Sequence, residues 1–241
     1  MKDKIISNLF ELWEYIGTKG KFLHVSEDYL YVQPKNNSWP NIVFGLKNEK
    51  NKLKKLYQKI DNKALPNSVS MLENKELEAG LIEHKFMLKS AVKGMYLNLT
   101  EHSMPDKNFS SIDEVNNEQR AVEFAKIASK SFGYEILEST IIPLINSSRL
   151  KLFIGKHNGK YVSSGMLLLD KNNISGLHMI GTIPECRGLG LGKIMTNKLL
   201  FEAYENKSAQ VVLVASEAGE RIYSKLGFIS DGILKSYKIG Q

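Results

Sequence analysis

The segment Pro184-Glu-Cys-Arg-Gly-Leu-Gly-Leu-Gly-Lys193 contains the residues whose types and spacing point most directly to chemistry. Three glycines in five residues allow the backbone to turn tightly and to approach a ligand without intervening side chains. An amphipathic helix is predicted immediately afterwards, over residues 192–206. The unpaired N–H groups and the positive dipole end of a helix N-terminus attract an anion. The segment therefore predicts a binding site for phosphate groups.

The spacing of these glycines excludes two common phosphate-binding motifs. A P-loop requires Gly-x-x-x-x-Gly-Lys-Ser/Thr, but Arg187 stands at its first position and Ile194 at its last. A dinucleotide fingerprint requires G-x-G-x-x-G after the first strand of a Rossmann unit, whereas this chain has G-x-G-x-G after strands that are predicted to be antiparallel. What remains is the pattern Arg-x-x-Gly-x-Gly, formed by Arg187, Gly190 and Gly192.

The elements that position this segment alternate between strands and helices. Asn158-Gly159 predicts a tight hairpin, and the continuous apolar run 211–215 predicts a strand that is buried on both faces and is reached by a parallel crossover. The elements predicted for this half are two helices over 117–146 that meet near Gly133, strands 150–157, 161–169 and 174–183, the helix after the glycines, strand 211–215, a short helix from about residue 217, and strands near 227–230 and 233–239.

The first half of the chain shows a fainter version of the same order. Its predicted elements are strands 28–33 and 41–46, a Lys-rich helix over 47–63, strand 67–72, helix 74–84, and strands near 85–90 and 92–99. Leu81-Ile-Glu-His-Lys-Phe86 aligns with Tyr223-Ser-Lys-Leu-Gly-Phe228, which indicates an internal repeat. The turn at 45–49 before the Lys-rich helix lacks the glycine pattern, so this half is interpreted as a degenerate copy. The polar stretch 100–108 predicts the linker, which divides the chain into domains 1–104 and 105–241.

Composition excludes several other classes of protein. Of 241 residues, 42% are hydrophobic and 24% are charged, as in folded domains and unlike disordered chains. Without a long apolar run or a signal peptide, we expect a cytoplasmic protein with no membrane partner. The single cysteine, Cys186, has no Cys or His at ligand spacing, so no metal is expected. The net charge of +7 is mostly lysine, and with only four arginines we expect no nucleic acid partner.

Residues 108–241 resemble the GNAT superfamily of acyl-CoA-dependent N-acetyltransferases. The resemblance rests on the Arg187-x-x-Gly190-x-Gly192 pattern, on Pro184 three residues before the Arg, on the Tyr223-x-x-x-Gly227-Phe228 pattern about 30 residues further on, and on the order of the elements. It implies an α/β fold with a mixed, mostly antiparallel sheet, helices on both faces and a cleft where two strands splay. With the first half included, it implies a tandem GNAT-like fold whose silent half completes the acceptor cleft. Trp39, Pro40 and Asn41 are candidates for that cleft, with turn or core roles as the alternative.

The resemblance also implies that acetyl-CoA is the co-substrate and that no metal takes part. The pyrophosphate would bind backbone N–H groups of residues 188–193, and the pantetheine arm would pair with residues 180–182, where their strand splays from 211–215. Ser216 stands where the family often has Asn. The expected acetyl-CoA-binding residues are Ile180, Gly181, Thr182, Arg187, Gly188, Leu189, Gly190, Leu191, Gly192, Lys193 and Ser216.

Aminolysis of a thioester needs a neutral amine, a stabilised oxyanion and a protonated leaving thiolate. Tyr223 matches the family position whose phenol is directed at the sulfur, which implies a general-acid role. A backbone N–H near Thr182 would stabilise the oxyanion. His178 is expected to share a face with Gly176, Ile180 and Thr182, and it is similar in position to the catalytic His of some arylalkylamine-type members. Whether His178 is the base or only lines the pocket is left open.

The resulting prediction is an N-acetyltransferase that transfers an acetyl group from acetyl-CoA to a primary amine of a small molecule. A protein or peptide N-acetyltransferase fits the same residues. A non-catalytic acyl-CoA-binding module is a third hypothesis, against which Tyr223 argues because a binder needs no acid at the thiol. The oligomeric state is not predicted.

Overall fold

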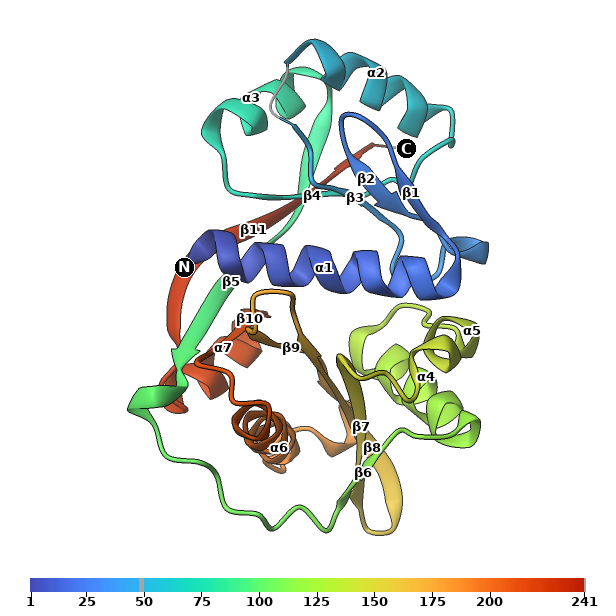
Figure 1. Ribbon diagram of the computed structural model, residues 1–241. Helices are drawn as coiled ribbons and strands as arrows, with labels where there is room; N and C mark the ends of the chain where they lie inside the picture. Colours follow the sequence, from blue (N-terminus) through green and yellow to red (C-terminus); the bar gives the residue numbers. More distant parts are fainter. Residues whose placement is uncertain (48–49, 241) are drawn as a thin grey trace.

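The computed structural model describes residues 1–47 and 50–240 and contains one mixed sheet of eleven strands. The strand order is β1-β2-β3-β4-β11-β5-β10-β9-β8-β7-β6. Within the described residues, β3 pairs with β4 and β9 with β10 in parallel, and the other neighbours are antiparallel. The prediction of a mixed, mostly antiparallel sheet with helices packed against it is therefore confirmed (Figure 1).

The strands are β1 (Leu23–Val25), β2 (Leu30–Val32), β3 (Ile42–Phe44), β4 (Val69–Leu72), β5 (Phe86–Asn98), β6 (Ile112–Glu114), β7 (Leu150–His157), β8 (Lys160–Leu169), β9 (Ser175–Thr182), β10 (Gln210–Ala215) and β11 (Ile229–Ile239). The α-helices are α1 (Lys2–Gly20), α2 (Lys50–Asp61), α3 (Lys75–Glu83), α4 (Glu118–Phe132), α5 (Glu138–Ile141), α6 (Leu191–Glu205) and α7 (Glu217–Lys225). Among the described residues, no helix is both long enough and apolar enough to span a membrane.

Three apolar clusters form the core because the helices bury their apolar faces on both sides of the sheet. The first joins α1, α4 and α5 to one face, and Ile5, Leu12 and Ile16 of α1 are at most 1% exposed. The second packs α6 and α7 on the opposite face, around β9 and β10. The third lies under α2 and α3. In Figure 1, α1 runs between an upper part, which contains α2 and α3, and a lower part, which contains α4 to α7.

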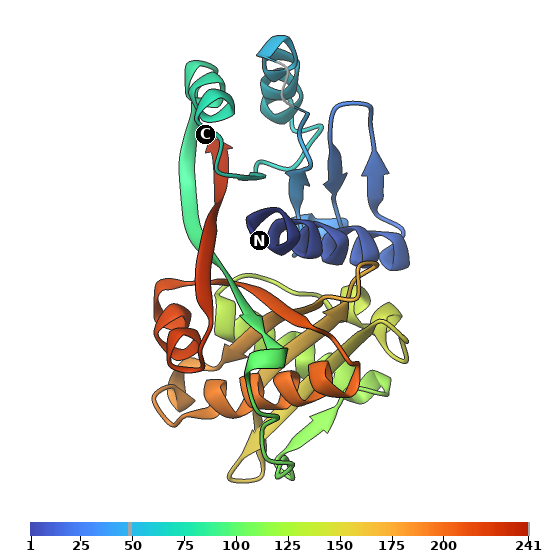
Figure 2. The ribbon, with the colours of Figure 1, turned by 60° about the vertical axis from the view of Figure 1, so that its left-hand side comes forward.

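Each half of the chain contributes its long strand to the other half. After α3, β5 pairs antiparallel with β10, from Lys93 opposite Ala215 to Asn98 opposite Gln210. After α7, β11 pairs with β4 of the first half. The two long strands also pair with each other and run side by side from the upper to the lower part (Figure 2). The predicted repeat is visible in this arrangement, since both copies place a helix before a long strand that crosses to the other half.

The structure corrects several predicted elements. Helix α1 was not predicted, although its apolar residues recur at helical spacing. Two strands were predicted within 85–99, but β5 is one continuous strand. The prediction divided it because its exposed first part and its buried second part differ in apolar pattern. The two predicted closing strands are one strand, β11, with an irregularity between Ser230 and Ile233. Residues 48 and 49 of the predicted turn lie outside the described residues, and the domain boundary at residue 104 stays a prediction.

The exchange of strands predicts that the second half does not fold alone. A chain of residues 105–241 lacks β5, so β10 loses its antiparallel partner and the second core cluster loses Met95 and Leu97. We expect this chain to show no cooperative unfolding transition in circular dichroism. Co-expression with residues 1–104, which contain β5, should restore the transition. Cooperative unfolding of residues 105–241 alone would contradict the prediction.

Candidate active site

Gly188 and Gly190 lie in the connection between β9 and α6 and adopt backbone angles that favour glycine. Their φ angles are 80° and 77°, in the left-handed region where a Cβ atom is strained. A Cβ atom built on either residue would meet no heavy atom within 4 Å, so the space above them is open. Gly190 is the N-cap of α6, and no side chain caps this helix. The loop therefore exposes its backbone directly in front of a helix N-terminus.

The backbone N–H groups of residues 188–193 fit the anion site that the sequence predicted. Cys186 and Arg187 donate to Ile183 and Pro184, and Ile194 donates to Gly190 in the first turn of α6. Between them, no N–H group of residues 188–193 has a backbone acceptor among those that the structure records for loops and helix ends in the described residues. Consecutive unpaired N–H groups at a helix N-terminus form a cradle for phosphate oxygens. The residues present are thus suited to hold the pyrophosphate of a coenzyme A thioester.

Arg187 and Lys193 lie at the two ends of this loop and have different surroundings. The guanidinium of Arg187 donates to the carbonyl oxygens of Thr182 (3.3 Å) and Ser131 (2.9 Å). It therefore ties the loop to the end of β9 and to the C-terminal turn of α4. Lys193 is exposed in the first turn of α6, where its ammonium can approach a bound anion. Leu189 is 54% exposed at the tip of the loop.

Strands β9 and β10 pair over a short length and then separate. Only Ser175, Gly176 and Leu177 pair with β10, although β9 continues to Thr182. On its other side β9 has an irregularity opposite Gly165, and Met179 there has a φ of 50°. Such a bulge takes backbone groups out of regular pairing and bends the strand. The predicted splay between these strands is present, and it lies beside the glycine loop.

The bulge also changes which face the side chains of β9 occupy. His178 and Met179 both lie on the face of α1 and α4, whereas Ile180 packs in the cluster of α6 and α7. A Cβ atom on Gly181 would meet Ser131 of α4, so Gly181 again faces the first side. The prediction that His178 shares a face with Ile180 and Thr182 is therefore wrong, because the extra residue of the bulge reverses the alternation of side chains between the two faces of the sheet. Its shared face with Gly176 is confirmed.

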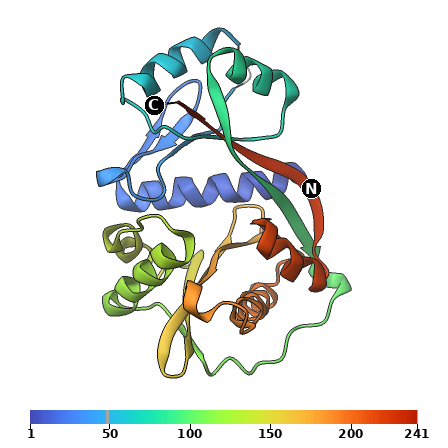
Figure 3. The same ribbon diagram turned by 180° about the vertical axis from the view of Figure 1, so that it is seen from behind.

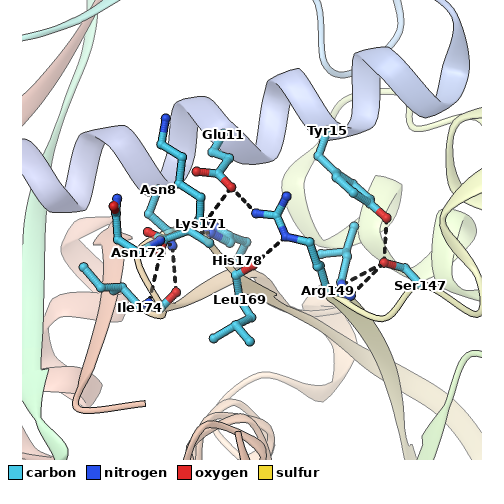
Figure 4. Close-up of polar contacts among 12 residues, drawn as sticks. Asn8, Glu11, Tyr15, Ser147, Arg149, Leu169, Lys171, Asn172, Ile174 and His178 are labelled. Carbon is cyan, nitrogen blue, oxygen red and sulfur yellow. Dashed lines mark hydrogen bonds and ion pairs between the residues drawn. The ribbon is translucent and has the colours of Figure 1, made fainter. Parts of the chain in front are cut away.

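His178 lies in a buried hydrogen-bond network with α1 (Figure 4). The side chain is 6% exposed, and its Nε2 atom is 2.8 Å from Oδ1 of Asn8. The amide nitrogen of Asn8 donates to Asp170 and to the carbonyl of Ile174, so Oδ1 accepts and Nε2 of His178 donates. Burial lowers the pKa of His178 to about 3, because the cation would be desolvated. At neutral pH, His178 is a neutral donor facing α1.

Further polar residues on the same side of α1 bind the second half. Glu11 pairs with the guanidinium of Arg149 and accepts from the backbone N–H of Lys171 (3.0 Å). The hydroxyl of Tyr15 is 2.6 Å from Oγ of Ser147. Sequence reasoning missed this set. The feature of the sequence that could have revealed these residues is the spacing of Asn8, Glu11 and Tyr15, which places three polar groups on one otherwise apolar face of a helix.

Tyr223 and Ser216 lie on α7 beside the end of β10. Ser216 is the N-cap of α7 and accepts from the N–H of Gly219 at 3.3 Å. Tyr223 is 8% exposed and packs against Phe228, with ring centroids 5.8 Å apart. Burial raises the pKa of Tyr223 to about 12. No hydrogen bond of its hydroxyl is recorded within the described residues.

Apart from the glycine loop and Tyr223, a cavity of about 750 Å³ lies between the two halves. Trp13 of α1, Trp39, Pro40 and Asn41 line it from the first half, and Tyr134 and Glu135, between α4 and α5, line it from the second. The N–H of Trp39 donates to the carbonyl of Glu135 at 2.9 Å and joins the two walls. The candidate residues 39–41 therefore do line a space between the halves. Its volume suits a small organic molecule.

The chain belongs to the acetyltransferases of the GNAT family. The family model described as an acetyltransferase (GNAT) domain matches residues 113–236, just over half of the chain. These residues contain the glycine loop, the separating strands and Tyr223. No curated protein matches the sequence.

Solved structures show the same fold over nearly the whole chain. A GCN5-related N-acetyltransferase from Kribbella flavida aligns with a TM-score of 0.67 at 16% identity, over 91% of this chain and 89% of its own. A GCN5-related N-acetyltransferase from Sphaerobacter thermophilus aligns with a TM-score of 0.62 at 13% identity, over 93% and 84%. A tandem GNAT protein from the clavulanic acid biosynthesis pathway aligns with a TM-score of 0.57 at 10% identity, over 88% and 79%. At these identities the likeness establishes the fold, including its first half.

The lowered pKa of His178 predicts a pH-dependent stability. The unfolded imidazole titrates near 6.5 and the folded one near 3, so only the unfolded state gains a proton between these values. The contribution of His178 to the free energy of unfolding is therefore fully present above pH 6.5 and is lost as the pH falls toward 3. From pH 7 to pH 5 this group alone should lower the free energy of unfolding by about 2 kcal/mol.

Urea unfolding of the parent and of His178→Gln, which keeps an N–H donor but does not titrate, should reveal this difference. The variant should lose less stability than the parent over this range, whereas His157→Gln in the hairpin between β7 and β8 should behave as the parent does. Parallel pH dependences for the parent and His178→Gln would show that the imidazole is not held neutral.

Gly190→Asp tests the backbone cradle. A carboxylate on Gly190 would stand in the open space in front of α6 and repel phosphate, so we expect the affinity for acetyl-CoA to fall by at least about a hundredfold in calorimetry. Gly159→Asp is the matched control, because Gly159 has a φ of 76° and the same open surroundings, but lies in the hairpin between β7 and β8. Equal affinities for the two variants would argue against the cradle.

Proposed function

We propose that this protein transfers the acetyl group of acetyl-CoA to a primary amine of a small molecule. The observation that carries the proposal is the position of the unpaired N–H groups of residues 188–193 beside the point where β9 and β10 separate. A ligand with a pyrophosphate on these groups can place an extended arm between the two strands. Acetyl-CoA has this form, and its thioester supplies an activated acyl group.

The residues of the chain would hold the cofactor along this path. Gly188 to Lys193 would bind the pyrophosphate through their backbone, and Arg187 would keep the loop in place through Thr182 and Ser131. Ile180, Gly181 and Thr182 would pair with the pantetheine arm, and Ser216 lies at the opposite side of the separation. The oxyanion would bind a backbone N–H of β9, for which the bulge at Met179 and Ile180 offers groups outside regular pairing.

Tyr223 is the proposed proton donor to the leaving thiolate. As the amine nitrogen forms its bond to the carbonyl carbon and the C–S bond breaks, the phenol proton passes to the sulfur. The phenol of Tyr223 is protonated at neutral pH. Because burial raises its pKa to about 12, the phenolate left after proton transfer is more basic than an ordinary tyrosinate and is reprotonated from solvent. The acceptor amine must lose a proton before or during the attack.

Two routes can take the proton from the amine. His178 as the base stays a prediction, but its Nε2 atom is bound to Asn8 and its side chain faces α1. Burial keeps its pKa near 3, so that it is a weak base. We therefore favour release of the proton to water. Parent and His178→Gln should then show the same pH profile of kcat/KM, whereas a general base would produce a limb in the parent that the variant lacks.

The cavity between the halves is the proposed acceptor site. Trp39 and Trp13 of the first half line it, and its volume favours a small molecule over a protein chain. A peptide acceptor remains the second candidate. Thiol release from acetyl-CoA with a panel of amines, amino acids and peptides tests both. No release with any acceptor would leave a binding module as the explanation.

Tyr223→Phe should lower kcat by at least about a hundredfold, the usual scale of general-acid catalysis, with little change in the affinity for acetyl-CoA. Tyr57→Phe is the control, because Tyr57 lies on α2 against the third core cluster, away from the glycine loop. Thiol release measures kcat, and calorimetry measures the affinity. A Tyr223→Phe enzyme with the turnover of the parent would show that Tyr223 only packs against Phe228.

A further inference from the structure

The charged residues of the cavity between the halves come from different walls. Glu135 lies between α4 and α5 of the second half, Lys63 follows α2, and Lys89 is on β5. In Figure 3, α4 and α5 lie below the C-terminal part of α1, and the upper part, to which α2 and the first part of β5 belong, lies above it. A ligand in the cavity thus has a carboxylate on the side of the second half and ammonium groups on the side of the first half.

Among the described residues, the side chains of Lys63, Lys89 and Glu135 have no ion-pair or hydrogen-bond partner. By contrast, Lys93 is paired with Glu220 at 2.6 Å and Lys235 with Glu78 at 2.6 Å. Unpaired charges of both signs around one cavity are complementary to a ligand that also carries both signs.

Asn41 adds a directional group at the end where Glu135 lies. Its Oδ1 atom is buried and has no hydrogen-bond partner within the described residues. Asn41 is two residues from Trp39, whose N–H is bound to the carbonyl of Glu135. A buried acceptor without a donor has lost its hydration without compensation. Because this atom has almost no accessible surface, a donor in the cavity reaches it only when the Asn41 side chain turns toward the cavity. An amine supplies such a donor, and the carboxylate of Glu135 attracts the same group.

We propose that the cavity binds a primary amine that also carries an acidic group, a carboxylate or a phosphate. The amine end lies toward Asn41 and Glu135, on the side of the half that holds the glycine loop. The acidic end lies toward Lys63 and Lys89. The inference rests on the proposed function for the claim that this amine is acetylated, whereas binding of the amine follows from the cavity alone. The first half then selects the acceptor by binding the acidic group of the acceptor.

Matched pairs of amines test the proposal with the full-length protein and acetyl-CoA. One pair is γ-aminobutyrate and its amide, and the other is aminopropyl phosphate and aminopropanol. In each pair only the acidic group differs. We expect calorimetry and thiol release to favour the acidic member of at least one pair by about tenfold or more. The pair with the larger ratio distinguishes carboxylate from phosphate.

Variants identify the groups responsible. Lys63→Met combined with Lys89→Met should bring the ratio within each pair close to one, whereas Lys160→Met in the exposed hairpin should leave it unchanged. Glu135→Gln should weaken both members of a pair alike, because both carry the amine. Lys89→Glu should reverse the preference, toward a diamine of similar length. All these side chains are exposed, so the variants should fold as the parent does.

Equal binding of the acidic and neutral members by the parent would overturn the proposal, as would a preference that survives the double lysine variant. The failure of the proposed function is distinguishable from these outcomes. If no free coenzyme A is released with any amine, the proposed acetyltransferase activity is contradicted. Calorimetry with the same pairs still decides whether the cavity selects acidic amines.

Discussion

The separation of β9 from β10 is the constraint on which the rest of the site depends. Two parallel strands that paired along their whole length would leave no room for an extended ligand between them. Here pairing ends after Leu177, and the bulge at Met179 bends β9 away. Backbone groups at the separation lose their partners in the sheet and must find others. The glycine loop and α6 begin where this strand ends, so the proposed anion site and the gap between the strands are parts of one feature.

Elements of the first half contact both strands at this separation. Strand β5, from the first half, is the antiparallel partner of β10 over its full length. Helix α1 lies across β9 and β10, and Asn8 binds His178 one residue before the bulge. Gly176 has to be glycine for this contact, because a Cβ atom there would overlap with the amide oxygen of Asn8. The degenerate half is thus a structural part of the site, although it has no glycine loop of its own.

Burial determines the chemical state of the two titratable groups that the sequence singled out. The same desolvation lowers the pKa of His178 and raises that of Tyr223, because it disfavours the charged form of each. Both groups are neutral at physiological pH, as a tyrosine with its ordinary pKa also is, whereas for His178 burial excludes the cation even in mild acid. For Tyr223 this state is the one that a proton donor requires. For His178 it produces a fixed hydrogen-bond donor that anchors β9 to α1.

The sequence by itself determined the chemistry of the glycine loop and the order of elements around it. Gly188, Gly190 and the following helix are typical of an anion site, and this signal is local, since backbone angles and a helix N-terminus depend on neighbouring residues only. The pairing of Leu81 with Tyr223 in the alignment of the two halves was also readable, because a repeat preserves its local pattern.

The tertiary structure alone decided which side chains face one another across the site and how the two halves pack. One inserted residue at Met179 moved His178 to the opposite face from Ile180, and alternation along a strand cannot reveal a bulge. The role of α1, the exchange of β5 and β11 and the cavity at Glu135 all join residues that are far apart in the chain. Asn8 and His178 are 170 positions apart, and their contact follows from how the two halves pack. Local propensities carry no information about such a contact.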